Sequence, residues 1–360
     1  MKAIALIKTG NAATAFEVRE IAKPQPQKGE VLIKVDTFGL NFADVMARKG
    51  MYKDAPPLPA ILGYDVAGIV DAIGENVSTL KIGDRVTAMT RFGGYAEYAV
   101  TNASAVAVIP DNIDNATATA LTTQYCTAYY AAAEMVNLHE GDKVLIQAGA
   151  GGVGTALIQY AKYKKCEIFA TAGSDTKLNY LSSLGVHHPI NYATQDFEIE
   201  IKNLIGEGKG VDVIFDAVGG KSVKKGFRLL APGGRIVCYG AADLTNKNLF
   251  GKLKAVLDFG LYHPLMLIAL SKAIIGINML HIADDKPSVL NRCLEEVVQL
   301  TSQGVFTPTL SKVFNAVDIA AAHEYLEKRK SIGKVVMRWS YFFTFTCPDL
   351  PMESVSWAIA

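Results

Sequence analysis

A short glycine-rich stretch offers the clearest chemistry in this sequence. Gly149, Gly151 and Gly154 follow the spacing GxGxxG in "AGAGGVGTAL", and Gly152 and Val153 complete the loop. An apolar strand is predicted to end at the first glycine and a helix to begin at the last. Glycine lets the backbone approach a pyrophosphate, and a helix N-terminus supplies N–H groups and positive potential. The pattern predicts a dinucleotide site; the alternative is a tight turn that binds nothing.

The next predicted strand, within "CEIFATAGSDTK", indicates which dinucleotide would bind. An NAD site places an acid about 20 residues after the glycines, at the end of this strand. Here the strand ends in Ala172, Gly173 and Ser174, and Asp175 is expected to support the N-terminus of the following helix instead. The Ser174 hydroxyl and the Lys177 ammonium could hold a 2′-phosphate, so we predict NADP, used as NADPH. The alternative for Lys177 is an ordinary solvated lysine.

A second stretch, "GLNFADVMARKGMY" at 39–52, sets an amide and a carboxylate among apolar residues. Asn41 and Asp44 are therefore either solvent-facing loop residues or part of a site. A catalytic zinc needs about three His, Cys or carboxylate ligands. The cysteines form no CxxC pair, and no cysteine or acid is placed to complete a site at His187 and His188. We predict no metal, and the role of Asp44 stays open.

The pattern of predicted strands and helices changes twice along the chain. Residues 1–120 read as short apolar strands separated by glycine and proline, which is typical of a β-rich domain. Residues 121–300 alternate strands with helices, which predicts a doubly wound parallel sheet. The β-rich pattern resumes over 301–339. The fold class is therefore α/β with two domains, and the tail 340–360 fits neither and has no assigned role.

Composition excludes several classes of protein. Of 360 residues, 50% are hydrophobic and 20% charged, and the net charge of +1 provides no basic excess for nucleic acid. The apolar stretch 259–271 is too short for a spanning helix, which needs about 20 apolar residues, so no transmembrane segment is predicted. The thiols read as reduced, which favours a cytoplasmic protein. The apolar strand 273–278 is expected at the sheet edge, where it would be covered in a homodimer.

Taken together, these motifs resemble a known family. "LNFADVMARKGMYKDAPPLPAILGYDVAGIV", "GDRV", "AGGVG" and "IGKVV" occur in the order found in the medium-chain dehydrogenase/reductase superfamily. The similarity covers 1–339 and is closest to the zinc-free quinone oxidoreductase branch, among homologues of the synaptic-vesicle amine-transport membrane protein. It implies a GroES-like catalytic domain followed by a Rossmann cofactor domain. Zinc-dependent relatives carry cysteine at the place of Asn41, "GHE" at the place of 63–65, and a four-cysteine lobe that this chain lacks.

The resemblance also implies roles for individual residues. Asn41 and Tyr52 match residues beside the nicotinamide, and Met46 replaces a tyrosine common in the family, which makes the cleft less polar. Matches on the cofactor side are Thr127 near the phosphates, Lys177 and Tyr192 at the 2′-phosphate, and Gly240, Ala241, Asn278 and Met279 beside the nicotinamide ribose.

Without zinc, the acceptor must already be electrophilic. We therefore expect NADPH-dependent hydride transfer to a small molecule, either a quinone or an α,β-unsaturated carbonyl. Asn41 or Tyr52 could bond the developing oxyanion, and Tyr52 or water could supply the proton. One alternative is an NADPH-binding regulatory protein with little turnover. The other, an enoyl-thioester reductase, lacks support from a lysine–arginine cluster near the predicted cleft.

Overall fold

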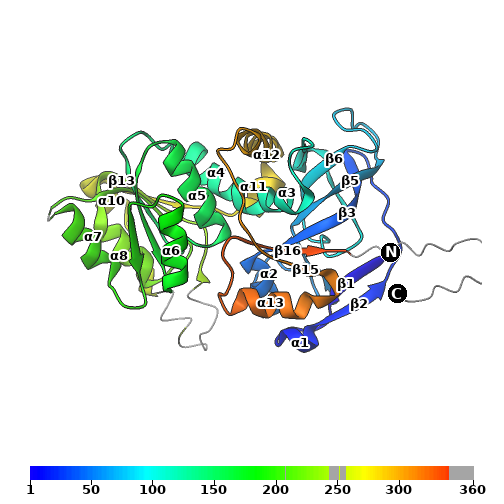
Figure 1. Ribbon diagram of the computed structural model, residues 1–360, viewed down its shortest axis with the longest axis horizontal. Coiled ribbons are helices and arrows are strands. Elements are labelled where there is room, and N and C mark those ends of the chain that lie inside the picture. The colour runs from blue at the N-terminus through cyan, green and yellow to red at the C-terminus, as the bar shows by residue number, and fades with distance from the viewer. Residues whose placement is uncertain (207, 243–250, 252–256, 340–360) are drawn as a thin grey trace, which may run out of the picture.

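The computed structural model describes residues 1–206, 208–242, 251 and 257–339, and the tail 340–360 lies outside this description. Two sheet-based bodies lie side by side, one built on a parallel sheet and one on mostly antiparallel strands (Figure 1). The chain starts in the antiparallel body, crosses to the parallel one and returns. The predicted α/β fold class, a GroES-like domain with a Rossmann domain, is confirmed.

The parallel sheet has the doubly wound order β11-β10-β9-β12-β13-β14. Chain order runs outward in one direction from β9 and then in the other from β12, so the switch point lies between these two strands. In such sheets ligands bind outside the carboxyl ends of the strands at that point. The strands are β9 (Lys143–Ile146), β10 (Glu167–Ala172), β11 (His188–Asn191), β12 (Val211–Asp216), β13 (Leu230–Cys238) and β14 (Ala273–Gly276).

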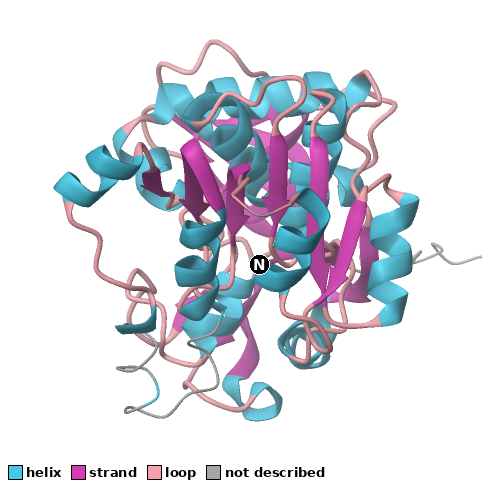
Figure 2. Cartoon of the chain, turned by 90° about the vertical axis from the view of Figure 1, so that its left-hand side faces the viewer, coloured by secondary structure: helices cyan, strands magenta, loops and turns pink. Residues whose placement is uncertain are grey.

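Helices cover both faces of this sheet (Figure 2). Successive side chains of a strand point to opposite faces, so Val144 and Ile146 join one buried cluster while Leu145 joins the other. The first face is covered by α5 (Gly152–Tyr163), α6 (Asp175–Ser183) and α12 (Pro287–Ser302). The second is covered by α7 (Phe197–Ile205), α8 (Lys221–Leu229) and α10 (Pro264–Leu270). Burial on both faces explains why these strands are apolar almost throughout.

The other body contains a seven-stranded sheet in the order β15-β16-β3-β5-β6-β8, with β7 also on β3. Its strands are β3 (Glu30–Leu40), β5 (Asp65–Ile73), β6 (Arg85–Met89), β7 (Tyr98–Asn102), β8 (Val106–Val108), β15 (Leu310–Asn315) and β16 (Lys334–Arg338). A smaller sheet is formed by β1 (Lys2–Leu6), β2 (Phe16–Glu20) and β4 (Ala60–Ile61). Because β16 pairs antiparallel with β3, the last described strand lies directly beside the strand that leads into Asn41.

Short helices connect the sheets. They are α1 (Ala12–Ala15), α2 (Phe42–Arg48), η1 (Ala103–Ala105), α3 (Asn115–Ala120), α4 (Cys126–Tyr129), α11 (Met279–Asp285), η5 (Ala316–Asp318) and α13 (Ile319–Glu327). The two segments η2 (Leu121–Tyr125) and η3 (Tyr130–Met135) have π-helical hydrogen bonding. Such π-helical turns are rare and occur frequently at functional sites. Here η2 is the first turn after α3, where the chain enters the body built on the parallel sheet.

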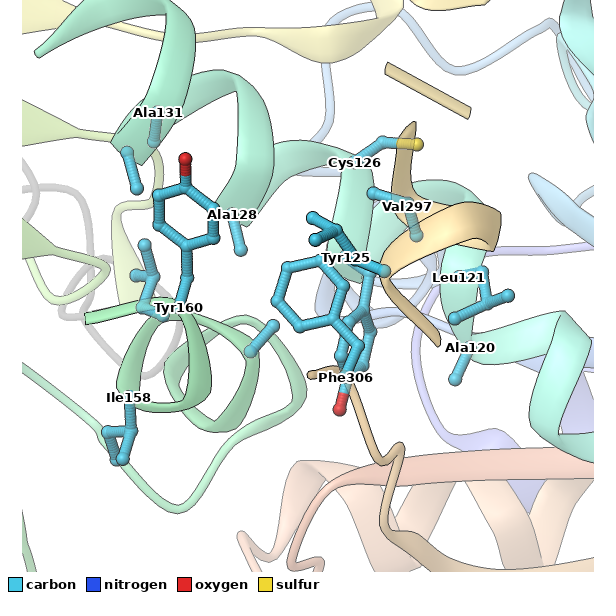
Figure 3. Close-up of a cluster of buried hydrophobic side chains, with 14 of the residues drawn as sticks. Ala120, Leu121, Tyr125, Cys126, Ala128, Ala131, Ile158, Tyr160, Val297 and Phe306 are labelled. Atoms are coloured by element: carbon cyan, nitrogen blue, oxygen red, sulfur yellow. The ribbon is translucent and has the colours of Figure 1, made fainter. Parts of the chain in front are cut away.

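An aromatic cluster packs where the chain returns from the parallel sheet (Figure 3). Phe306 is 1% exposed, and its ring lies 5.1 Å from that of Tyr125 in an edge-on arrangement and 6.1 Å from that of Tyr160. These three rings come from the return segment, from η2 and from α5. Their contact therefore fastens the helix of the glycine loop to the segment that leads into β15 and β16.

The strand β14 occupies one edge of the parallel sheet, as expected, and its residues are half-buried or exposed. The neighbouring helix α10 has no buried residue. A homodimer paired through this edge stays a prediction. Within the described part of the chain, no helix combines the length and apolar character needed to span a membrane.

The aromatic cluster generates a stability prediction. Phe306→Ala should lower the free energy of unfolding by about 3–5 kcal/mol, because it removes a buried ring and leaves a cavity between α5 and η2. Urea unfolding followed by tryptophan fluorescence and circular dichroism measures the change. Leu204→Ala is the control, since Leu204 is 52% exposed. A loss below about 1 kcal/mol for Phe306→Ala would contradict tight packing here.

Candidate active site

The glycine loop has the geometry that a pyrophosphate requires. Helix α5 begins at Gly152, and the preceding Gly151 has no side chain to cap its first N–H groups. A Cβ atom on Gly154 would lie 2.6 Å from the carbonyl oxygen of Ala148, so the tight turn depends on glycine there. The open end of a twelve-residue helix therefore points its N–H groups and positive dipole outward. The loop fits a dinucleotide phosphate.

The other predicted cofactor residues follow the carboxyl ends of neighbouring parallel strands. Gly173 and Ser174 follow β10, Tyr192 follows β11, Gly240 and Ala241 follow β13, and Asn278 and Met279 follow β14. Parallel strands end at one edge of a sheet, so the topology brings these residues to the same side as the glycine loop. This placement supports their predicted role, and their individual contacts with a cofactor remain predictions.

A pair of cationic residues lies beyond the end of β10. The Lys177 ammonium donates to the carbonyl oxygen of Arg329 at 2.7 Å. Burial lowers the pKa of Lys177, and the nearby positive charge of Arg329 lowers it further. The Tyr192 ring lies over Gly173, where an added Cβ would come within 2.5 Å of the Tyr192 hydroxyl. Two close cations and a phenol at this place form a suitable site for an anion such as a 2′-phosphate.

Arg329 was not predicted from the sequence as a cofactor residue. It follows α13, in the body that carries the antiparallel sheet, whereas Lys177 lies in α6 of the other body. Their proximity depends on how the two bodies meet, and no local pattern in the sequence signals it.

Two of the predicted cofactor residues form hydrogen bonds between their side chains and the backbone of a helix. The Thr127 hydroxyl donates to the carbonyl oxygen of Thr123 at 2.6 Å. The side-chain oxygen of Asn278 accepts the N–H of Leu280 at 3.1 Å and so caps α11. These bonds fix local structure, and the predicted contacts of Thr127 and Asn278 with a cofactor stay predictions.

Asn41 is the residue immediately before helix α2, and Asp44 lies in the first turn of that helix. One carboxylate oxygen of Asp44 accepts the backbone N–H of Asn41 at 2.8 Å, while the other is buried without a partner. Burial raises the pKa of Asp44 to about 7; the Asn41 N–H opposes this shift, and the negative charge of Asp65 adds to it. The open question about Asp44 is therefore settled in one respect: it is an interior residue, not a solvent-facing one.

Aromatic side chains line the region beside α2. The half-buried Tyr52 contacts Tyr64 edge-on, with ring centroids 6.4 Å apart, and Tyr64 packs on Phe92 at 5.0 Å. Burial raises the pKa of Tyr52, so its phenol remains protonated at neutral pH and is available as a donor. The Tyr64 hydroxyl is buried without a hydrogen-bond partner. The three rings form an aromatic surface next to which the charged side chains of Asp54 and Arg91 also lie, and such a surface suits a flat acceptor.

The Asn41 side chain is held by two buried charges. Its amide nitrogen donates to Asp65 at 2.7 Å, its amide oxygen accepts from the Lys334 ammonium at 2.9 Å, and Lys334 forms an ion pair with Asp65. Asn41 is 6% exposed, Asp65 0% and Lys334 1%. An ammonium has no acceptor and a carboxylate has no donor hydrogen, so the amide can adopt one orientation only.

Strand register explains how these residues meet. Gly39 of β3 pairs with Asp65 of β5 on one side and with Val336 of β16 on the other. Lys334 lies two residues before Val336 and so on the same face of the sheet. An added Cβ on Gly39 would lie 2.4 Å from Lys334 Cε and 2.9 Å from an Asp65 carboxylate oxygen. The absent side chain at Gly39 therefore leaves the space through which Lys334 reaches Asp65.

Comparison with known protein families identifies both parts of the chain. Residues 27–111 match the alcohol dehydrogenase GroES-like domain, and residues 152–295 match the family described as zinc-binding dehydrogenase. The chain is 35% identical over 326 residues to the synaptic vesicle membrane protein VAT-1 homolog of Rattus norvegicus, covering 89% of this chain and 80% of the relative. The chain belongs to the medium-chain dehydrogenase/reductase superfamily.

Solved structures of superfamily members have the same fold. A mycobacterial protein in complex with NADPH is 28% identical with a TM-score of 0.82, covering 94% of this chain and 99% of that chain. A quinone oxidoreductase of Pseudomonas syringae pv. Tomato is 26% identical (TM-score 0.81, 94% and 99% covered). The CurK enoyl reductase is 28% identical (TM-score 0.81, 94% and 99% covered).

Asn41 and Tyr64 do not suit the zinc ion found in other branches of the superfamily. Asn41 presents its amide oxygen to an ammonium 2.9 Å away, and a cation there opposes the approach of a metal ion. Tyr64 offers a phenol whose pKa is raised by burial. Among the described residues, no group of three or more His, Cys, Asp or Glu is arranged to hold a metal. We derive no step of the reaction through zinc.

The buried carboxyl of Asp44 predicts a measurable pH dependence. Its pKa rises from 3.8 in the unfolded chain to about 7 in the fold. Between these values the folded state binds more protons, so this group makes the protein less stable as pH rises, by about 1.4 kcal/mol per pH unit. Asp44→Asn should remove that slope, because an amide keeps the bond from the Asn41 N–H without titrating.

The measurement is chemical unfolding at several pH values between 4 and 7, with the difference between variant and wild type as the readout. The free energy of unfolding of Asp44→Asn, relative to that of the wild type, should increase as pH rises. Asp111→Asn, at an exposed position, is the matched control, and its free energy of unfolding relative to the wild type should not change with pH. An equally flat difference for Asp44→Asn would show that Asp44 does not titrate in this window.

Proposed function

We propose that this protein is an NADPH-dependent oxidoreductase that transfers hydride to a quinone or an α,β-unsaturated carbonyl compound. The observation that carries the proposal is the Asn41 carboxamide, held in one orientation by Lys334 and Asp65 at the start of α2. Such a preorganised donor can stabilise negative charge that develops on an acceptor oxygen. The oxidoreductase family is established, whereas the acceptor is part of the proposal.

NADPH, when bound, supplies the hydride. The chain's own residues then have two tasks: to hold the acceptor oxygen and to complete protonation. In a quinone or enone, conjugation moves the electron pair from the attacked carbon to a remote oxygen. The Asn41 amide is the proposed donor to that oxygen, and Tyr52, kept protonated by its raised pKa, is the proposed proton source. The remainder of the catalysis is placement of the acceptor against aromatic side chains.

The preference for NADPH over NADH is part of the same proposal. β10 ends without an acidic residue, and the cations Lys177 and Arg329 lie beyond it. An acid at that place would bind the ribose hydroxyls of NAD and repel a 2′-phosphate. The NADPH complex of the mycobacterial relative supports this assignment. The four described cysteines are unpaired thiols, which fits the proposed cytoplasmic location.

Two other functions have specific support. The similarity to CurK enoyl reductase favours an enoyl-thioester as the conjugated acceptor. The similarity to a synaptic vesicle membrane protein favours a binding protein that uses NADPH as a regulatory ligand. The quinone or enone reading is preferred because the aromatic surface at Tyr52, Tyr64 and Phe92 suits a flat acceptor.

An acceptor panel tests the proposal directly. NADPH oxidation is followed at its nicotinamide absorbance with simple quinones, enones and enoyl-thioesters, and the blank without enzyme is subtracted. Turnover with a quinone or enone is expected. Turnover with enoyl-thioesters alone would contradict a quinone or enone as the acceptor and would assign the enoyl-thioester instead. Tight NADPH binding without reduction of any acceptor would favour the regulatory function instead.

Charge reversal tests the cofactor preference. Lys177→Glu should weaken NADPH binding by at least about 10-fold, because it places a carboxylate beside the 2′-phosphate. NADH binding should change far less, since that cofactor has no phosphate there. Fluorescence titration measures both dissociation constants, and Lys224→Glu on α8 is a control for the change in net charge. Equal weakening of both cofactors would assign Lys177 a structural role through its bond to Arg329.

A further inference from the structure

We propose that Lys334 and Asp65 are positioning residues, which set the place of the Asn41 amide relative to the nucleotide loop. This inference rests on the proposed function, in which Asn41 bonds the acceptor oxygen. Neither charged residue reaches the surface, and neither was singled out by sequence. Their contacts extend from Asn41 to the cofactor-binding body by two separate routes.

The Asn41 amide is held at both ends by a charged group. The Lys334 ammonium bonds the amide oxygen of Asn41, and the Asp65 carboxylate accepts from its nitrogen. The amide of Asn41 therefore cannot rotate by half a turn without placing like partners together. The ammonium at the amide oxygen also draws electron density away from the amide nitrogen, which strengthens its remaining N–H as a donor in this buried setting. The pair thus controls both the direction and the strength of the proposed donor.

The first route to the cofactor runs through Asp65. Its second carboxylate oxygen accepts from the Thr122 hydroxyl at 2.8 Å and from the Thr123 backbone N–H at 3.0 Å. Both belong to the π-helical segment η2. The next residue, Gln124, lies against Gly152, where an added Cβ would come within 1.7 Å of the Gln124 side-chain oxygen. One carboxylate therefore links Asn41 to the first residue of α5.

The second route runs through Lys334. The preceding residue, Gly333, donates its N–H to the carbonyl oxygen of Ala150 at 2.9 Å, within the glycine loop. Gly333 and Gly151 also form an isolated parallel bridge. Lys334 is the sequence neighbour of Gly333, which contacts the loop. Asp65 accepts a hydrogen bond from Thr123, whose sequence neighbour Gln124 lies against Gly152. Because both routes end there, the spacing between the amide and the bound dinucleotide depends on this pair.

Stability alone does not account for burying these charges. Removing two ions from water costs several kcal/mol each, and replacing a buried pair by neutral side chains is often neutral or stabilising. Removing one partner is different, because the other charge is left buried and unpaired. This asymmetry separates a structural role from a positioning role: a double variant can retain the fold while the Asn41 amide loses its fixed orientation.

The test is the double variant Lys334→Met, Asp65→Asn in the full chain. It leaves no unpaired charge, and the new amide at position 65 can donate or accept, so Asn41 becomes free to rotate. Unfolding stability should stay close to wild type, whereas each single variant should be destabilised by about 3–5 kcal/mol. The matched control is Arg228→Met, Glu198→Gln, which removes an ion pair between α8 and α7.

The kinetic readouts use the best acceptor found for the wild type. The double variant should lose about 10-fold or more in kcat, because a misplaced donor acts mainly in the transition state, while the acceptor KM changes less. The primary isotope effect with deuterated NADPH should rise as hydride transfer becomes slower than product release. The control variant should keep wild-type kcat and isotope effect.

The outcomes separate this inference from the proposed function. A folded double variant whose kcat and isotope effect match the wild type would overturn the positioning role and leave the proposed function intact. Absence of wild-type turnover with every acceptor would refute the proposed function, and the positioning role with it. A parallel loss of kcat in the control would show that any ion-pair removal slows the enzyme, and would also overturn the inference.

Discussion

The buried ion pair between Lys334 and Asp65 is the interaction on which the arrangement of this molecule depends. It lies where β3, β5 and β16 run side by side, and Gly39 leaves the room for it. A sheet normally buries apolar side chains on this face, and two charges are tolerated because every partner is provided. The hydrogen bonds of Asp65 also extend to the π-helical turn that opens the cofactor-binding body.

This constraint has a chemical counterpart. In zinc-dependent members of the superfamily a metal polarises the substrate oxygen, whereas in the proposed function the Lys334 ammonium polarises the Asn41 amide, which is the proposed donor to the acceptor oxygen. An amide N–H stabilises negative charge less than a metal ion does, so the proposed function requires an acceptor that is already electrophilic. The aromatic side chains of Tyr52, Tyr64 and Phe92 are consistent with such an acceptor, since their rings can pack against a conjugated ring.

The sequence was sufficient for the architecture and for the glycine loop, because both depend on local patterns. Alternating strands and helices, and three glycines between them, indicate a doubly wound sheet directly. No local pattern marks Lys334 as a site residue, because its partner Asn41 lies 293 residues away and only strand register brings the two together. Arg329 was missed for the same reason. The sequence does not decide whether Asp44 faces solvent, because the periodicity of a seven-residue helix does not reveal which face is interior.

The position of Lys334 near the end of the described chain has a consequence for biosynthesis. A ribosome that has released the first half of the polypeptide has delivered Asn41 and Asp65 but not the cation that neutralises the cluster. Until β16 arrives, burying Asp65 leaves a carboxylate without a counter-charge, and that state is disfavoured by several kcal/mol. The buried arrangement of Asn41, Asp65 and Lys334 can therefore be completed only after β16 has been synthesised.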